Sequence, residues 1–551
     1  MPQSQPQHQY SEKPEKAPYP DSTTPPESTF FESSTGTVEP EPELDPKAEA
    51  RAVRKADSTV LPLLFLGLLV FQLDRMNIAS ALTNGFHTSI GVSTNTINLG
   101  NQLMFIGIVL LEIPSNMLLQ RIGPRKWISA QVFLFGLVAS LQPLIRDKKG
   151  FLVSRAVLGL CEAGYIPGAV YTLSNWYRSQ ELGKRVAVLF FGMFGGNAIS
   201  PLLGAGILRL DGRGVGNGMR GWQWLFLLEG LFTISVSIIL LFFLPGSPRN
   251  PRPLLSPGLI RFSPSDSAIL VRRLEKDHVL HGTSSLSPSH PTTSHQLEPK
   301  QTTPDLNQTE SQSPPKKRST ERGLSIPPSL VWKTITHYRR WPHYLSTFAV
   351  FSTWSSLTTY TPSILLSLGW SRTSANALAC VGGFLSLIVV FFFAWLSDRT
   401  NRRGATVIAA QVCYLVVLIV CRQVQQGKEM EELGRWSRWG LWTAVNAFAV
   451  GYHPVHNTWV QLNCRGEGER SVGIAMWVMS AITGLMAGTQ FYRAGDGPFY
   501  EKGLLIQICM VSAGIFFAAM QIVIYVVHNR RVVAGKVKPG KDGEEPQVYV
   551  P

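Results

Sequence analysis

Long apolar segments separated by polar loops dominate the pattern of hydrophobic and polar positions along this chain. Each segment is close to the roughly 20 residues that a helix needs to cross the hydrocarbon core of a bilayer. The pattern therefore predicts an all-α membrane protein with twelve transmembrane helices. We place them at 59–81, 99–119, 127–145, 151–174, 185–208, 222–244, 343–368, 374–396, 404–422, 436–462, 470–492 and 503–527.

Polar stretches divide these segments into two groups of six. The N-terminal stretch is rich in Pro, Glu, Ser and Thr, and the middle stretch has a Ser-, Thr- and Pro-rich centre. Such compositions bury too little apolar surface to fold, so we expect disorder in both. The predicted plan is a disordered tail at 1–58, a six-helix bundle at 59–244, a largely disordered linker at 245–342, a second six-helix bundle at 343–527 and a tail at 528–551.

The distribution of basic residues predicts the orientation. Arg51, Arg54 and Lys55 precede the first segment, whereas the loop at 82–98 has no Lys or Arg. Cytoplasmic loops carry an excess of Lys and Arg, and the first helix usually dominates the choice. We therefore expect both tails and the linker to be cytoplasmic.

The composition narrows the functional class. The chain has 551 residues, of which 16% are charged, below the roughly 25% of soluble domains. Its net charge of +15 resides mainly in tails and loops, so we expect a lipid bilayer and no nucleic acid as partner. No H-E-x-x-H, G-x-S-x-G or P-loop pattern lies in a fitting context, which argues against an enzyme or an ATP-driven pump. We expect no cofactor and no catalytic residue.

Ionisable side chains within the apolar segments are concentrated in the first six. A charge at mid-bilayer costs at least ~2.5–3.5 kcal/mol, so such residues usually line a pathway or pair with one another. Carboxylates and arginines that must face inward indicate proton handling beside anion binding, as in a transporter. These residues are Asp74, Arg75, Glu112, Arg155, Glu162 and Glu229.

Two pairs among them suggest a mechanism. Arg155 and Glu162 are two helical turns apart and share a face of one helix, whereas the adjacent Asp74 and Arg75 diverge by about 100°. We hypothesise that Arg155 or Arg75 binds a substrate carboxylate, with Asn77 beside them, and that Asp74 and Glu162 exchange protons. An arriving anion that diverts the arginine would favour proton uptake by the carboxylate.

A structural interpretation of the same residues stays open. Either pair could be an ion-pair network that holds the bundle together. Glu112 lies before Pro114 and fits helix–helix hydrogen bonding better than proton transfer. Glu229, near one end of the sixth segment, fits a structural role.

The second half would supply shape and polarity to a substrate site. Candidates are Trp354 and Tyr360 in the seventh segment and His456 and Asn457 in the tenth. Packing or lipid contact would explain the aromatic residues equally well, and a packed histidine is the alternative for His456. His453 and His456 have no Cys or carboxylate to complete a metal set, so we expect no metal site.

A repeated loop links the two halves. The second segment is followed by NMLLQRIGPRKW from Asn116, and the eighth ends in AWLSDRTNRRG from Ala394, with basic residues at matched spacing. Matched loops indicate a duplicated six-helix unit, and two such units can rock about a site at the membrane midplane. The loop residues that we expect to act in gating are Arg121, Arg125, Asp398, Arg399 and Arg402.

These loops resemble the signature G-x-x-x-D-R-x-G-R-R of the major facilitator superfamily. The second copy keeps Asp398 and Arg399, whereas the first departs at Asn116 and Gln120. A narrower resemblance is to the anion:cation symporter family, in its fungal allantoate-permease-like branch. The segments that carry it are FQLDRMNIASAL, RAVLGLCEAGYIPGAVYTLSNWY, GWQWLFLLEG, YTPSILLSLGWS, HNTWVQLNCRGEGERS and GTQFYRAGDGPFYEKG.

The resemblance implies a major facilitator fold and proton-coupled symport of a small organic anion, such as a carboxylate, vitamin or ureide. In similar bacterial sugar-acid symporters, an Asp-Arg pair in the first helix and an Arg/Glu pair in the fourth have the roles proposed above. The family usually works at the plasma membrane, and we expect a monomer. Two alternatives stay open: a metabolite exporter of the same fold, and a nutrient sensor that does not transport.

Overall fold

The computed structural model describes residues 45–213, 218–255, 258, 260–283, 328–426, 434–537 and 546–551. These residues are mainly helical. The first half contains helices α1 (Pro46–Thr83), α2 (Phe86–Ser89), α3 (Thr94–Ile122), α4 (Pro124–Leu141), α5 (Lys148–Glu162), α6 (Tyr165–Ser174), α7 (Ser179–Ile207) and α8 (Gly221–Phe243). The linker contributes α9 (Pro264–Thr283) and α10 (Pro328–Ile335). The second half contains α11 (Trp341–Ser367), α12 (Arg372–Thr400), α13 (Arg403–Gln426), α14 (Arg435–Phe448), α15 (His453–Leu462), α16 (Gly466–Gly488) and α17 (Glu501–Val533).

Every predicted apolar segment coincides with a helix or a pair of helices, which confirms the all-helical membrane fold. In the described part of the chain, ten helical stretches are long and apolar enough to cross a membrane. The other two predicted spans do not meet these requirements of length and hydropathy, and the structure shows why. α11 is 27 residues long but rich in Ser and Thr, and the tenth span is interrupted between α14 and α15.

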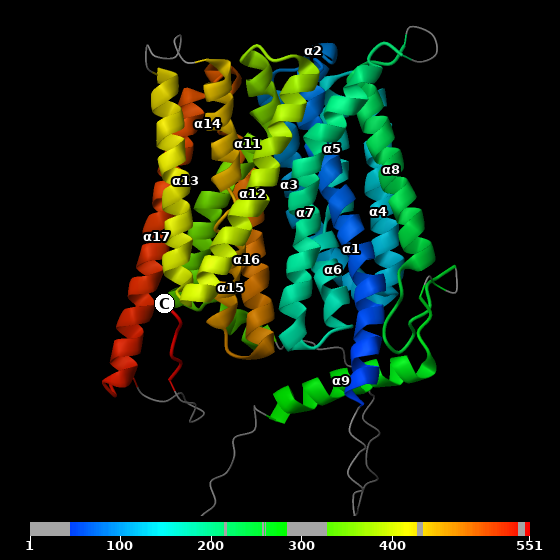
Figure 1. The fold of residues 1–551 in the computed structure, drawn as a ribbon, viewed down its shortest axis with the longest axis vertical. Helices are drawn as coiled ribbons and strands as arrows, with labels where there is room; N and C mark the ends of the chain where they lie inside the picture. The colour runs from blue at the N-terminus through cyan, green and yellow to red at the C-terminus, as the bar shows by residue number, and fades with distance from the viewer. Residues whose placement is uncertain are drawn as a thin grey trace, which may run out of the picture. The chain divides into compact units, whose positions relative to one another are not determined.

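The helices pack into two bundles, α1–α8 and α11–α17, that meet mainly where α7 contacts α12, α1 contacts α11 and α3 contacts α16. Figure 1 shows the blue to green helices of the first half beside the yellow to red helices of the second. The beginning of α1, α9 and the end of α17 lie at one end of the bundles, here named the α9 end. The opposite end, which carries α2, is named the α2 end.

The N-terminal boundary differs from the prediction. α1 begins at Pro46, so residues 46–58 are helical and not part of a disordered tail. Ion pairs hold this extension to neighbouring helices: Lys55 to Asp266 of α9 at 2.5 Å, and Asp57 to Arg185 of α7 at 2.7 Å. The part of the predicted tail at 1–44 lies outside the described residues.

The linker also contains more structure than expected. The helix α9 packs on α1, and its Arg273 binds Glu49 of α1 at 2.6 Å and Glu181 of α7 at 2.7 Å. The pKa of Asp266, which burial alone would raise, is lowered by its bonds to Lys55 and Ser263. The Ser- and Thr-rich centre at 284–327, for which disorder was expected, lies outside the described residues.

The predicted C-terminal tail likewise begins as helix, because α17 continues to Val533. Residues 546–551 then lie against the second bundle at the α9 end. Tyr549 is buried, stacks on Tyr525 with 4.5 Å between ring centroids, and exchanges backbone hydrogen bonds with the Asn529 amide. Val550 is held in the same way by Asn463. Residues 538–545 lie outside the described part.

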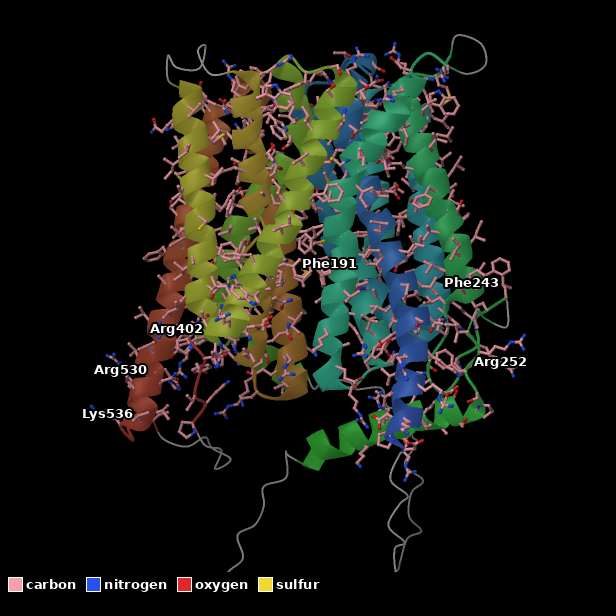
Figure 2. All side chains as sticks on the ribbon, in the orientation of Figure 1. Phe191, Phe243, Arg252, Arg402, Arg530 and Lys536 are labelled. Carbon is pink, nitrogen blue, oxygen red and sulfur yellow. The ribbon has the colours of Figure 1, made fainter. Side chains whose placement is uncertain are left out.

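The labelled basic residues Arg252, Arg402, Arg530 and Lys536 all lie toward the α9 end in Figure 2. Phe191, by contrast, lies at mid-height where the halves meet, and its ring stacks on Phe391 of α12 with centroids 4.8 Å apart. Phe191 and Phe391 thus form an apolar contact between the two bundles at this height.

Candidate functional site

A central cavity lies between the two halves. Its walls come from α1, α3, α5, α6 and α7 of the first half and from α11, α15 and α16 of the second. Four of the predicted site residues line it: Arg75, Arg155, Glu162 and Trp354. A mostly apolar cavity with a few convergent polar groups is the usual form of a small-molecule site.

A break in the fourth span positions Glu162 in this cavity. α5 ends at Glu162 and α6 begins at Tyr165, so the carboxylate projects where the helix is interrupted. Gly164 adopts a left-handed conformation with φ 82°, and a Cβ atom there would lie 2.5 Å from the Ser115 hydroxyl. Only glycine suits this backbone and this spacing.

Close packing between α3 and α5 positions Arg155. A Cβ atom on Gly159 would lie 2.0 Å from the carbonyl oxygen of Met104, so the two helices touch backbone to backbone. Small residues are what permit such an approach between membrane helices. Gly159 and Gly164 thus allow α3 to come close to the helix break at Glu162.

Arg75 and Glu162 form a buried ion pair. The Arg75 Nε donates to a Glu162 carboxylate oxygen at 2.7 Å, and the guanidinium lies 4.1 Å from the Phe71 ring centroid. The Arg75 side chain is 12% exposed and that of Glu162 is fully buried. The second Glu162 oxygen has no hydrogen-bond partner among the described residues. The sequence paired Glu162 with Arg155, whereas its direct partner is Arg75.

Arg155 is almost fully buried and only partly satisfied. One terminal nitrogen donates to the Asn101 side-chain oxygen at 2.7 Å, and the Asn101 amide reaches the Thr359 hydroxyl of the second half at 3.5 Å. The Arg155 Nε and its other terminal nitrogen have no partner in the described part of the chain. A guanidinium with unpaired donors can bind a planar anion such as a carboxylate through two hydrogen bonds.

Asp74 and Asn77 lie elsewhere. Both are fully buried but neither lines the cavity, because Arg75 takes the inward direction and its neighbour in α1 points away. Asp74 instead lies near Thr233 and Glu229 of α8, and Asn77 is close to Glu229. The hypothesis that Asn77 touches substrate therefore has no support from its position.

In the second half, Trp354 lines the cavity beside Phe351 and Phe194. The Tyr360 hydroxyl instead binds the Asn98 side chain above the cavity, toward the α2 end. His456 lies behind the wall, where its ring bonds His343 at 3.0 Å.

Asn457 does not line the cavity either, and its side chain accepts from Gln461 at 3.1 Å. The histidine in the wall is His453, at the start of α15. Its ring stacks on Phe351 and lies against Trp477, both with centroids 4.3 Å apart. This position mirrors Glu162, because each lies where the fourth or the tenth span breaks.

Several polar lining residues are not among the site residues predicted from the sequence. The signal available for them is a polar side chain within an apolar segment. Glu112, read as a packing group, also lines the cavity. The polar lining residues outside the predicted set of site residues are Gln72, Asn101, Glu112, Ser355, Thr358, Thr359 and His453.

The gating loops make contacts within their own halves. Arg403 at the start of α13 pairs with Asp398 and also donates to the Ser397 hydroxyl at 2.8 Å. Arg125 donates to the backbone oxygen of Arg252, and the Arg399 guanidinium lies 5.4 Å from the Trp395 ring centroid. Arg121 and Arg402 are exposed.

Hydrogen bonds between the halves gather toward the α2 end. The Asn98 amide donates to the Tyr492 backbone at 2.6 Å, and the Asn376 amide donates to the Thr83 hydroxyl at 2.7 Å. On α3, the residues that line the cavity come after Asn98 in the chain and therefore lie nearer to the α9 end than these contacts do. The cavity is therefore separated from the α2 end by a bonded layer.

Comparison with known proteins places this architecture. The sequence profile of the Major Facilitator Superfamily matches residues 64–489. An uncharacterized transporter of Saccharomyces cerevisiae is 25% identical over 480 residues, covering 85% of this chain and 80% of the relative. A protein of Agrobacterium vitis described as a candidate tartrate transporter is 32% identical over 207 residues, covering 37% of this chain and 44% of its own. The crystal structure of a D-xylose-proton symporter shares the fold with a TM-score of 0.59 at 14% identity, covering 84% of this chain and 96% of that one.

Proposed function

This chain belongs to the major facilitator superfamily and is a secondary transporter, and on that premise we propose that it carries a small organic anion together with protons. The substrate would bind in the central cavity and reach either side of the membrane by alternating access. The class that we propose is a carboxylate, vitamin or ureide.

The single observation that carries the anion assignment is the partly unsatisfied Arg155. The Arg155 side chain lines the cavity, and its Nε and one terminal nitrogen have no protein partner among the described residues. A buried guanidinium without a counterion is costly, and a planar carboxylate satisfies two of its donors at once. Asn101 and Thr359 would orient the bound anion, because they already link Arg155 to the second half.

The Arg75–Glu162 pair supports coupling to protons. A substrate carboxylate in the cavity would compete with Glu162 for Arg75, since Arg75 also lines the cavity. Glu162 deprived of its counterion would then accept a proton, because an isolated buried carboxylate is costly. One proton would thus enter the protein with each anion.

The comparisons support the same substrate class. The sequence segments from FQLDRMNIASAL to GTQFYRAGDGPFYEKG resemble the anion:cation symporter family. The relative from Agrobacterium vitis is named as a tartrate transporter. We therefore propose membership of that family, in the branch similar to fungal allantoate permeases.

We further propose that the α9 end faces the cytoplasm, in the plasma membrane, with the protein acting as a monomer. Arg51, Arg54 and Lys55, which precede the first span, support this orientation, because the loop at 82–98 after that span has no Lys or Arg. With this orientation the bonded layer would separate the cavity from the outer side of the membrane. Asp398 and the loop arginines would then rearrange as the inner side closes.

The test is uptake of labelled carboxylates, vitamins and ureides by cells that express the full chain, at external pH 5 and 7, with and without a protonophore. We expect one compound to accumulate faster at pH 5, and we expect the protonophore to abolish this. Arg155→Gln should abolish uptake, whereas Arg249→Gln, which changes a largely exposed arginine, should not. Absence of uptake with the protein confirmed at the surface would overturn the import proposal in favour of export or sensing.

A further inference from the structure

Side-chain amides form a row along one face of α3, near the α2 end. Asn95, Asn98 and Asn101 follow one another at intervals of three residues, and Gln102 lies beside the last of them. Residues three or four positions apart on a helix are neighbours on its surface, so these amides share one side of α3. They are named here the α3 amide row, and each of them is hydrogen-bonded to the second half.

Asn98 is at the centre of the row and is 1% exposed. Its amide nitrogen donates to the Tyr492 backbone oxygen at 2.6 Å, and its oxygen accepts from the Tyr360 hydroxyl. The Tyr492 ring stacks on that of Tyr500 with centroids 4.4 Å apart, and the Tyr360 ring lies against both. One amide of the first half is thus held by a cluster of tyrosines in the second half.

The contacts on either side of Asn98 also bridge the halves. Nearer the α2 end, the Asn95 side-chain oxygen accepts from the Ala494 backbone nitrogen at 3.1 Å. Further along α3, the Gln490 amide donates to the Gln102 side-chain oxygen at 3.1 Å. All of these groups are uncharged, and a neutral hydrogen bond has a modest net strength because water competes for the same atoms. Such a row can hold the halves together and still separate when water enters.

Asn101 connects the row to the cavity. Its side-chain oxygen accepts from an Arg155 terminal nitrogen at 2.7 Å, while its amide nitrogen reaches the Thr359 hydroxyl of α11 at 3.5 Å. Arg155, Asn101 and Thr359 all line the cavity. The Nε and the other terminal nitrogen of Arg155 have no partner among the described residues. An anion bound to them would therefore contact both halves only while the row is bonded.

We propose that the α3 amide row is the seam that opens and closes the cavity toward the α2 end, and that Asn101 is the positioning residue through which an anion on Arg155 closes it. A ligand shifts a conformational equilibrium only by its difference in affinity between the two states. With the row bonded, Asn101 holds Arg155 against the second half and the anion contacts both halves. With the row separated, the anion keeps only the first half. This deepens the proposed function and rests on it for the presence of an anion.

The seam can be tested in the full-length chain without any ligand. Thr358→Cys places a reporter thiol in the cavity wall, and a membrane-impermeant thiol reagent is added to intact cells or to inside-out vesicles. The labelling rate is the excess over the same chain with Thr358, which accounts for the native cysteines. Asn98→Ala removes two bonds of the row, so labelling from the side that the α2 end faces should become about 3- to 10-fold faster. Labelling from the opposite side should become slower, because the two openings alternate.

Asn446→Ala is the matched control, because it removes an amide that is bonded to Thr361 within the second half. It should leave both labelling rates unchanged. A protein that is merely loosened by the loss of an amide would be labelled faster from both sides. Faster labelling of Asn98→Ala from both sides, or no change from either side, would therefore overturn the seam.

The role of Asn101 is tested with acetate, benzoate and tartrate, against chloride at equal ionic strength. Binding is measured separately, as a rise in the midpoint temperature of unfolding. A carboxylate that raises this temperature should slow labelling from the side of the α2 end. In Asn101→Ala the same carboxylate should still raise the temperature but should no longer slow labelling.

A carboxylate that binds without slowing the labelling, or that slows it equally in Asn101→Ala, would overturn the coupling through Asn101. Failure of the proposed function gives a different result. If none of the three carboxylates raises the midpoint temperature, the coupling is overturned together with the anion assignment, whereas the labelling without ligand decides the seam on its own.

Discussion

The fourth span, in the first half, and the tenth span, in the second half, are both interrupted. The side chains at the two interruptions have different chemistry. At the first, Glu162 projects into the cavity and is paired with Arg75. At the second, His453 projects into the same cavity but lies between the rings of Phe351 and Trp477. Equivalent positions in the two halves thus hold a charge in one and an aromatic stack in the other.

This difference suggests a division of labour between halves that share one architecture. Among the cavity residues described, the first half supplies Arg75, Glu112, Arg155 and Glu162, whereas the second supplies hydroxyls, aromatic rings and one histidine. We infer that the first half handles the charge of anion and proton, and that the second half fits the remainder of the substrate.

The largest expected effect on this comparison comes from removing Arg155, the buried cation in the cavity. Arg155→Gln removes the proposed counterion of the substrate, and truncation of one member of a buried charge pair costs roughly 2–5 kcal/mol. We expect affinity, measured by substrate protection against thermal unfolding, to fall on the order of 100-fold. Arg155→Lys should restore little, because an ammonium cannot bind a carboxylate in the same bidentate geometry. An unchanged affinity in Arg155→Gln would contradict the anion site.

A second, smaller effect concerns the ion pair at the first break. Glu162→Gln leaves Arg75 buried without its partner, and breaking such a pair typically costs about 3–5 kcal/mol of stability. We expect a lower midpoint temperature of unfolding in detergent, with recovery in the double variant Arg75→Gln/Glu162→Gln. Recovery of stability without recovery of proton-driven uptake would show that the pair does more than hold the bundle. If the double variant also accumulated substrate like the wild type, the pair would be only structural.

At the second break, His453→Phe should have a modest effect. The phenyl ring keeps the stack with Phe351 and Trp477 but loses any hydrogen bond to substrate, a contribution of about 0.5–1.5 kcal/mol. We expect KM to rise about 3- to 10-fold and the preference among anions to change, with the pH dependence of uptake preserved. Loss of the proton dependence in this variant would place ionic coupling in both halves.

The smallest effect is expected from deleting residues 546–551. This segment hydrogen-bonds to Asn463, Asn529 and Trp459 at the α9 end of the second bundle. Its removal should lower the midpoint temperature of unfolding by a few degrees and leave KM unchanged, since none of the segment lines the cavity. A changed KM would mean that the segment controls access to the cavity.

The contact between Tyr549 of this segment and His337 predicts that the segment stabilises the protein less in acid. Burial, together with the charges of Arg340 and Arg339, lowers the pKa of His337 to about 4, so its ring is neutral at physiological pH and its Nε2 lies 3.5 Å from the Tyr549 hydroxyl. A histidine pKa that is lower in the folded than in the unfolded chain stabilises the folded protein at pH values above the ordinary histidine pKa of about 6.5. That stability is lost as the pH falls through about 4. The stability difference between full-length and truncated protein should therefore be constant from pH 6.5 upward and shrink toward pH 4.

The sequence was sufficient for the helices and for the charged half of the site. Apolar segments identify membrane helices because lipid tolerates little else, and Arg75, Arg155 and Glu162 stood out because charge within such segments is costly. Sequence spacing could not tell which neighbour on a helix faces the cavity. Asp74 and His456 were expected in the site, yet Arg75 and His453 occupy the corresponding directions.

Other features depend on contacts between distant segments. Residues 46–58 and α9 are polar, and they are ordered through ion pairs with each other and with α7. The meeting of Asp74 with Glu229 likewise depends on the packing of α1 against α8, which no local pattern specifies. These are long-range pairings, and a single sequence gives no direct record of them.

The central claim is that charge is handled in the first half and shape in the second. Its most direct test compares proteoliposomes containing wild type, Arg155→Gln or His453→Phe, loaded at equal protein content and given the same inward proton gradient and the same labelled anion. We predict gradient-driven accumulation in the wild type and, with a raised KM, in His453→Phe, but none in Arg155→Gln. Accumulation by Arg155→Gln together with its loss in His453→Phe would contradict the account.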